Sequence, residues 1–268
     1  LWLSIAEGTL TILSVVNRAY QPPFFCPTAS SIMKESKQKM RGLFLSKIAQ
    51  TNHPTFYYLR HHPTFMNLAD VFDISESYAN KRYHEYRDML VKVLRLPGHK
   101  ALLDDSWQAI ILDVTEQPIE RPAKKQRVWY SGKKKRHTAK IQLIVCLTTL
   151  QILSVVCGKG HTHDFTLFKR CGLHIAAAME TYADSGYQGL EKLVANAFTP
   201  IKKLKNRELT QDERAYNRAL STLRIRIEHV NRRCKIFRVT KEVYRGKHRH
   251  IQKTWTVVSA LVNYRYAG

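Results

Sequence analysis

The run Ala109-Ile110-Ile111-Leu112-Asp113-Val114-Thr115 decides the fold, because it sets one carboxylate inside an apolar strand pattern. A charge in apolar surroundings costs free energy unless a partner, often a metal ion, compensates it. Asp184 similarly ends the run Thr181-Tyr182-Ala183-Asp184, and Glu228 lies in the helical pattern of residues 223–230. The chain has only 21 acidic residues against 44 basic ones. Three such carboxylates predict one shared site for a divalent cation.

The segments around these acids predict an α/β domain over residues 98–268. Four segments rich in β-branched residues are predicted strands: 108–116, 138–148, 151–157 and 179–184. Helices are predicted from Asp164, over 210–236 and over 251–265, and Thr210 with Glu213 forms a capping box. A further short strand is predicted near 198–201. With the acids on the first strand, after the fourth strand and on a late helix, this order predicts a ribonuclease-H-like mixed sheet flanked by helices.

A small all-α region, residues 43–97, is predicted to precede the sheet as a helix-turn-helix. Apolar residues recur at helical spacing on both sides of Asp73-Ile74-Ser75, and Ser75 is a suitable N-cap. Asn80, Lys81, Arg82 and His84 are then expected to face outward near the start of the second helix, where a recognition helix meets DNA. The alternative is a helical hairpin with a solvated basic face. Residues 1–42 are poorly readable: residues 1–16 could form a helix, which the proline-rich stretch 22–27 would break.

Charge and composition point to a polyanionic partner. The net charge is +23 and the pI is about 10.0, yet 44% of residues are hydrophobic, enough for a core. Nucleic acid is the first expectation and an anionic membrane surface the second. Residues 1–16 are apolar but interrupted by Glu7, so they are too short for a membrane span and poor as a signal peptide. The five cysteines form no C-x-x-C pair and are expected to be reduced thiols in the cytoplasm.

Residues 120–140 form a basic run, with nine Lys or Arg against one Glu. Trp129-Tyr130-Ser131-Gly132 is predicted to turn at its centre. Four consecutive cations follow the turn: Lys133, Lys134, Lys135 and Arg136. Aromatic rings set among lysines are typical of a hairpin that grips a nucleic-acid strand. A solvated loop is the alternative.

Several motifs together resemble bacterial insertion-sequence transposases of the DDE type, from the group named after insertion sequence five. The resemblance covers roughly residues 43–265. Its motifs are Asp113-Val114-Thr115-Glu116, the stretch from Tyr130 to Thr138, Gly160 with His163-Asp164, the stretch from Tyr182 to Gly189, and Arg224, Glu228 and Lys235. The family often has a Tyr three residues before the Arg, and here that position holds Ser221.

The resemblance implies an enzyme that binds the ends of an insertion sequence and catalyses cleavage and strand transfer with two Mg²⁺ (or Mn²⁺) ions. Asp113 would bridge both ions, and Asp184 and Glu228 would each complete one. Arg224 and Lys235 share a helix face with Glu228 and would contact phosphates.

The resemblance also has implications for two neighbouring residues, for the binding partners and for the location in the cell. His163 and Asp164 are candidates for a supporting role beside the ligands, although Asp164 equally suits a helix N-cap. The implied partners are double-stranded DNA, from element ends and target, and further copies in a homodimer or larger synaptic assembly. The resemblance implies a protein of the bacterial cytoplasm that associates with the nucleoid and not with a membrane.

Other functions remain open from the residues alone. The chain could be an inactive or domesticated DNA-binding descendant, a metal-dependent nuclease without strand transfer, or a basic RNA-binding or structural protein. Each acid also has a purely structural explanation. Asp113 could end a strand, Asp184 could open an Asp-Ser-Gly turn, and Glu228 could pair with Arg224 or Arg232 on the surface. The intact triad argues against an inactive descendant and against a structural protein.

Overall fold

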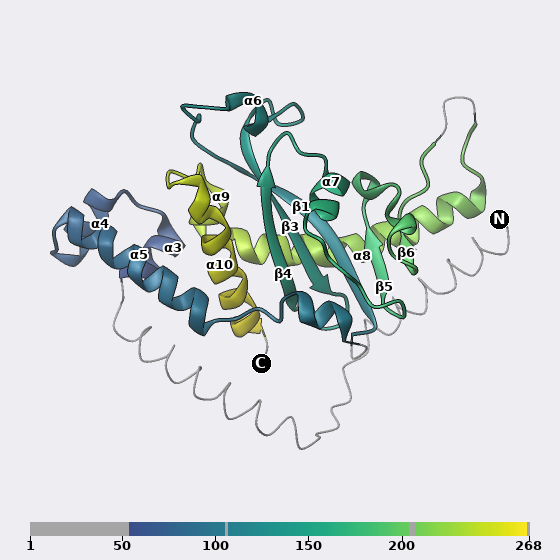
Figure 1. The fold of residues 1–268 in the computed structure, drawn as a ribbon, viewed down its shortest axis with the longest axis horizontal. Helices are drawn as coiled ribbons and strands as arrows, with labels where there is room; N and C mark the ends of the chain where they lie inside the picture. The colour runs from purple at the N-terminus through teal and green to yellow at the C-terminus, as the bar shows by residue number, and fades with distance from the viewer. Residues whose placement is uncertain (1–53, 105–106, 204–206, 267–268) are drawn as a thin grey trace, which may run out of the picture.

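The computed structural model describes residues 54–104, 107–203 and 207–266, which form a mixed sheet flanked by helices (Figure 1). The predicted segment 1–42 and residues 43–53 of the predicted all-α region lie outside the described residues. No helix in the described part of the chain has the length and apolar character needed to cross a membrane.

The sheet is built around the strand that carries Asp113. This strand, β1 (Ala109–Pro118), pairs antiparallel with β3 (Arg136–Cys146) on one side and parallel with β5 (Glu180–Ala183) on the other. The sheet continues from β5 to β6 (Ala197–Phe198) in parallel. The other edge of β3 pairs antiparallel with β4 (Ile152–Lys159) and with the short β2 (Tyr130–Ser131). The predicted strands are therefore confirmed, and the predicted 138–148 ends two residues earlier.

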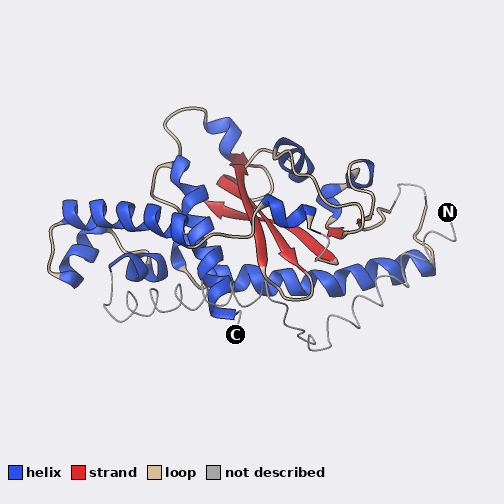
Figure 2. Ribbon diagram, turned by 60° about the horizontal axis from the view of Figure 1, so that its bottom comes forward, coloured by secondary structure: helices blue, strands red, loops and turns tan. Residues whose placement is uncertain are grey.

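Side chains that alternate along β1 divide the interior into two layers. Ile111 belongs to a cluster formed with the helices α8 (Gln211–Lys235) and α10 (Ile251–Tyr266). Its neighbours Ile110 and Leu112 belong to a second cluster, which includes Phe168 of α7 (Asp164–Arg170) and the turns that follow β5. The opposite sheet faces thus bury opposite sets of residues, as the period of two along a strand requires. The long helix α8 runs beneath the sheet in Figure 2.

The described part of the all-α region, residues 54–93, is called the helical region below. It contains α3 (Pro54–His61), α4 (Phe65–Phe72) and α5 (Glu76–Val93), and Ser75 caps α5 as predicted by accepting from the Tyr78 amide. It packs on α9 (Arg238–Lys241) and α10. Arg245 donates to the carbonyl oxygens of His62 and Pro63, and Lys253 pairs with Asp88 at 2.7 Å. Polar bonds therefore tie the helical region to the C-terminal elements.

Helix α8 forms as its sequence predicts. Thr210 accepts from the Glu213 amide while the Glu213 side chain accepts from the Thr210 amide, which completes the predicted capping box. Asp212 and Glu213 lie in the first turn and Arg232, Arg233 and Lys235 in the last, so both ends complement the helix dipole. The helix can therefore hold its C-terminal turns firmly against the sheet.

The centre of the basic run differs from its prediction. Residues Gln126–Trp129 form the short helix α6, and the hairpin turns later, after β2, with Lys135 in a left-handed conformation at φ 52°. Trp129 is only half-exposed because its ring packs on His248, with ring centroids 4.7 Å apart. The exposed tip of the hairpin is therefore Gly132 to Arg136, without the tryptophan.

Candidate active site

Two of the predicted acids lie on neighbouring strands. Leu112 of β1 pairs with Ala183 of β5 in parallel register, so Asp113 and Asp184 each follow one member of that pair. Asp184 caps the short turn Ser185–Tyr187, and its Oδ1 accepts from the Gly186 amide at 2.8 Å. The proximity of the two carboxylates raises the pKa of Asp113, second only to the effect of burial. The sheet register therefore brings together residues 71 positions apart in sequence.

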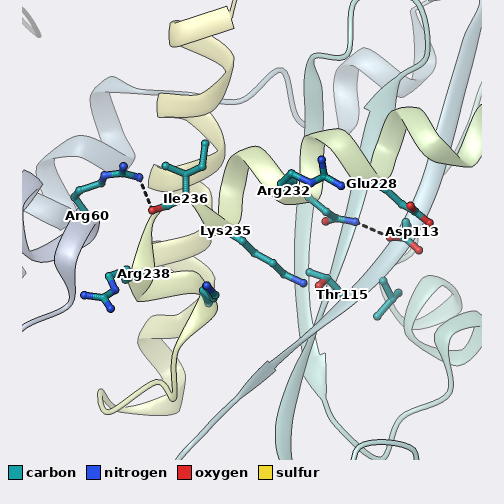
Figure 3. A pocket seen from close by; sticks show the side chains of 11 residues that line it. Arg60, Asp113, Thr115, Glu228, Arg232, Lys235, Ile236 and Arg238 are labelled. Atoms are coloured by element: carbon teal, nitrogen blue, oxygen red, sulfur yellow. Dashed lines mark hydrogen bonds between the residues drawn. The ribbon is translucent and has the colours of Figure 1, made fainter.

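The third acid faces the first across a groove. Glu228 projects from α8 toward Asp113, and both line a groove of about 720 Å³ (Figure 3). Glu228 is exposed at this surface. No ion pair joins it to Arg224 or Arg232 among the described residues, so the surface-pair explanation for Glu228 does not hold.

Asn231 holds Asp113 in position from the same helix. Its Nδ2 donates to Asp113 Oδ2 at 2.7 Å, which lowers the pKa of Asp113, as does the positive charge of Arg224. Burial and Asp184 act in the opposite direction and prevail, so the pKa of Asp113 is raised overall. The Asn231 Oδ1 atom is buried and has no hydrogen-bond partner within the part of the chain that the structure describes. The site therefore contains a destabilised carboxylate and an unused oxygen acceptor.

A fourth carboxylate lies beside Asp184. Asp164 is the first residue of α7, and its Oδ1 accepts from Lys140 at 2.6 Å. A Cβ atom added to Gly186 would lie 2.8 Å from Asp164 Oδ2 and 3.0 Å from Asp184 Oδ1. The expectation that Asp164 caps this helix is wrong, because His163 takes the cap position and forms no side-chain cap bond. Asp164 is engaged by Lys140 instead, and His163 is exposed.

Cations from the helix and from the hairpin also approach the groove. Lys235 lines it, and the pKa of Lys235 is lowered by burial, raised by Asp113 and lowered by Lys134. Lys134 belongs to the exposed hairpin tip, which also carries Lys133, Lys135 and Arg136. The structure therefore brings Arg224 and Lys235 of the predicted cations near Asp113, and it brings Lys134 near Lys235.

The predicted DNA-reading residues of α5 lie elsewhere. Lys81 is exposed, whereas Arg82 lies over the Tyr78 ring at 4.9 Å and pairs with Glu85. Asn80 and His84 line a second cavity, of about 610 Å³, between α5 and residues 244–250. The expectation that His84 faces outward is wrong, since its ring contacts Arg87 at 2.9 Å and packs on Phe65.

The donor set of the groove suits a hard divalent cation. Within residues 54–104, 107–203 and 207–266, no three His, Cys, Asp or Glu side chains are close enough to hold one ion together. The residues are nonetheless chemically suited to Mg²⁺, because this ion prefers oxygen ligands. A bound cation would also relieve the repulsion between the carboxylates of Asp113 and Asp184. The unpartnered Asn231 Oδ1 adds an acceptor for an ion's water.

Several residues of the site were assigned no role in the sequence-based predictions. Asn231 lies three positions after Glu228 on the same helix, so helical spacing could have identified it. Lys140 and Tyr187 give no local signal, because only the fold brings them to the acids. Tyr187 is buried, donates to Gln142 at 3.1 Å, and has its pKa raised by burial and then by Asp164, Asp113 and Asp184. It therefore lies close enough to Asp164, Asp113 and Asp184 to be affected by their charges.

Comparisons with known proteins identify the family of this chain. Residues 112–263 match the family model described as DDE superfamily endonuclease. The chain is also 39% identical over 214 residues to a protein of Microchaete diplosiphon named a probable transposase for insertion sequence element IS702. That alignment covers 78% of each chain. Residues 112–263 include all three predicted acids and every residue that lines the groove except Arg60.

Proposed function

This chain belongs to the DDE superfamily endonucleases, and we propose that it is the transposase of an insertion sequence. The proposed activity is cleavage of double-stranded DNA at the element's ends, followed by joining to target DNA. The observation that carries it is the placement of Asp113 beside Asp184 and across the groove from Glu228. The named relative supports the transposase over a nuclease that only cleaves.

We propose that the sheet is of the ribonuclease-H-like type. Support comes from the strand order β4-β3-β1-β5-β6, with only β3 antiparallel to its two main neighbours. In this arrangement the first acid lies on the central strand and the second at the end of the adjacent parallel strand. The third comes from a helix packed on the sheet, and α8 contacts β1.

Asp113, Asp184 and Glu228 are the proposed ligands of two Mg²⁺ or Mn²⁺ ions. Bound ions supply charge stabilisation for the attacking and leaving oxygens of a phosphodiester. Asn231 orients Asp113 through its 2.7 Å hydrogen bond, and Lys140 keeps Asp164 from adding an unbalanced charge beside Asp184. Small rotations of the Asp113, Asp184 and Glu228 side chains would bring their carboxylates together around the ions.

Groups around the carboxylates are proposed to hold the DNA. Lys235 and Arg224 are positioned to contact phosphates near the reacting bond, and the hairpin cations Lys133, Lys134, Lys135 and Arg136 to grip a strand. Asn80, Lys81 and Arg82 of α5 are the proposed contacts to element ends, with Lys81 the most accessible. Because two ends must meet, a homodimer or larger assembly is proposed, acting on nucleoid DNA in the cytoplasm.

The test is a cleavage and joining assay on DNA carrying the element's own ends, with Mg²⁺ present or withheld. The intact chain should cleave and join only with the metal. Asp184→Asn and Glu228→Gln should bind the same DNA without cleaving it, because each loses a ligand and keeps its shape. Cleavage without joining would favour the nuclease. Binding without cleavage by the intact chain would favour the inactive descendant.

A further inference from the structure

The groove beside Asp113 continues away from the carboxylates into a basic half. Asp113 and Glu228 lie at one end, Arg60 and Arg238 at the other, and Lys235 between them (Figure 3). Five cations line the groove in all: Arg60, Arg232, Lys235, Arg238 and Lys241. They come from α3, from the last turns of α8 and from α9. The positive charge is thus spread along the groove and does not converge on one point.

Most of this charge is uncompensated within the described chain. Arg238 pairs with Glu242 at 2.9 Å, but no ion pair engages Arg232, Lys235 or Lys241 among the residues that the structure describes. Clustered like charges repel, and burial chiefly lowers the pKa of Lys235, although neighbouring Asp113 raises it. Such a row is unfavourable in the isolated protein and becomes favourable when an extended anion neutralises it.

The far end of the groove is fixed in place by the helical region. Arg60 donates to the carbonyl oxygen of Ile236, the C-cap of α8, at 2.5 Å. Two contacts nearby, His62 with Glu242 and Arg245 with the His62 carbonyl, hold the same end of α3 against the α9 segment. Arg60 therefore keeps a set position relative to Lys235, although residues 60 and 235 are far apart in sequence.

We infer that the basic half of the groove is the path of the DNA backbone that leaves the reacting phosphate. The strand runs from the carboxylates along the C-terminal turns of α8, over α9, to Arg60 of α3. This inference rests on the proposed function and adds the course that the DNA backbone takes from the active site. A single strand carries a phosphate about every 3.4 Å along a duplex, so spaced cations on three elements match a polymer better than one small anion. The opposite half of α8 lies off this path.

The experiment compares two pairs of exposed cations in the full chain. Arg232→Ala with Lys241→Ala removes two charges from the groove. Arg218→Ala with Lys192→Ala removes two exposed charges elsewhere. Arg218 lies on the same helix, about 21 Å before Arg232 at 1.5 Å per residue. Binding of a fluorescein-labelled DNA duplex about three turns long is measured by anisotropy over a series of salt concentrations, without a divalent metal.

We expect the groove pair to lower the log–log salt slope by about 0.9 per lost phosphate contact, near 1.8 in total. Affinity should fall by roughly eightfold per contact at 0.1 M salt. The Arg218 and Lys192 pair should change the slope much less. Equal loss in both pairs, or none in the groove pair while the intact chain binds, would overturn the path but leave the transposase proposal standing.

Two further arms identify the anion. Inorganic phosphate that binds the groove by calorimetry, with duplex binding unaltered in the groove variant, would overturn the inference in favour of a small-anion site. Tighter binding of an RNA duplex of the same sequence, lost in the groove variant, would overturn it in favour of RNA. Failure of the intact chain to cleave element ends with Mg²⁺ would instead count against the proposed function, whatever the groove binds.

Discussion

The groove and the helical region both gather ionisable side chains, but the buried arginine of the helical region has its partners in place, partly from the C-terminal elements. Buried Arg87 donates to Asp88 Oδ1 at 3.0 and 2.7 Å, and Lys253 pairs with the other oxygen of Asp88. His84 and His250 complete the shell around Arg87 at 2.9 and 3.2 Å. Asp113 of the groove is repelled by neighbouring Asp184, and Lys235 has no ion-pair partner among the described residues.

This difference distinguishes charges that stabilise the fold by pairing with each other from charges that a bound ligand would neutralise. The free-energy cost of burying an arginine is largely offset when its hydrogen-bond acceptor is in place, so removing that arginine destabilises the fold. Two neighbouring carboxylates without a cation cost stability in the isolated chain, and that cost is recovered only when an ion binds. Charge alone does not distinguish the two regions, whereas the balance of partners around each charge does.

The largest expected effect follows from removing one groove carboxylate. Asp113→Asn should lower metal-dependent cleavage by roughly 10²–10⁴-fold, since a lost ligand forfeits several kcal/mol at about 1.4 kcal/mol per tenfold. Without metal, its melting temperature should equal or exceed that of the intact chain. The reason is that a raised pKa marks the charged form of Asp113 as unfavourable in the folded state.

The matched control for Asp113→Asn is Glu208→Gln. Glu208 is exposed and pairs with Lys203 and Arg214, outside the groove. It should leave cleavage unchanged. Thermal unfolding with and without Mg²⁺ provides a second measurement, since the ion should stabilise the intact chain and the Glu208 variant but not the Asp113 variant. Equal stabilisation of all three would remove Asp113 from the metal site.

A smaller effect is expected from the residue that orients Asp113. Asn231→Ala should lower cleavage and metal affinity by about 10–100-fold, as for other partners of metal ligands. Asn217→Ala is its matched control, because Asn217 lies on the same helix and also holds a distant segment, through Ile201. Both variants should lose some stability, but only Asn231→Ala should raise the Mg²⁺ concentration needed for half-maximal cleavage. The same metal requirement in both would reduce Asn231 to a structural residue.

Much of this fold was predictable because its signals are local. The capping box at Thr210, the Ser75 cap and the alternation along β1 each depend on residues within one element. The order of the elements then restricts the acids to adjacent strands and a covering helix. The sequence was therefore sufficient to select Asp113, Asp184 and Glu228 as candidate site residues.

The remaining features depend on contacts between distant segments. Lys140 pairs with Asp164 only because β3 passes the start of α7, and no spacing predicts that Asp164 is taken from its expected cap role. His84 was expected to face outward because helical periodicity places it beside Lys81. The periodicity cannot reveal that residues 244–250 cover that face of α5. Residues 244–250 therefore determine that this face of α5 is not open to solvent, and they are distant in sequence from the helix.

Two cations of α5 provide the next contrast. Arg87→Ala should destabilise the fold by about 1–3 kcal/mol, because it removes a buried side chain and the partner of Asp88. Lys81→Ala should change stability by less than about 0.5 kcal/mol, as an ordinary surface change. It should instead weaken binding to element ends, by roughly 1–3 kcal/mol if Lys81 reads a base. Urea unfolding and anisotropy separate the two outcomes, and a reversed pattern would contradict the assignment of both residues.

The smallest effect concerns pH. Burial, followed by the positive charge of Arg87 and the neighbouring His250, lowers the pKa of His84 to about 4, whereas Asp88 acts weakly in the opposite direction. The unfolded chain protonates this histidine near 6.5, so between about 6.5 and 4 the unfolded state binds more protons. The free energy of unfolding should therefore fall as the pH drops through that window.

His84→Gln should make this decline shallower, measured by urea unfolding at several pH values. A residual slope is expected from His250, whose pKa is also lowered, chiefly by burial. His161→Gln is the control, since His161 is exposed and lies outside this cluster. It should leave the slope as it is. An unchanged slope in the His84 variant would mean that the ring is not held neutral between α5 and the C-terminal segment.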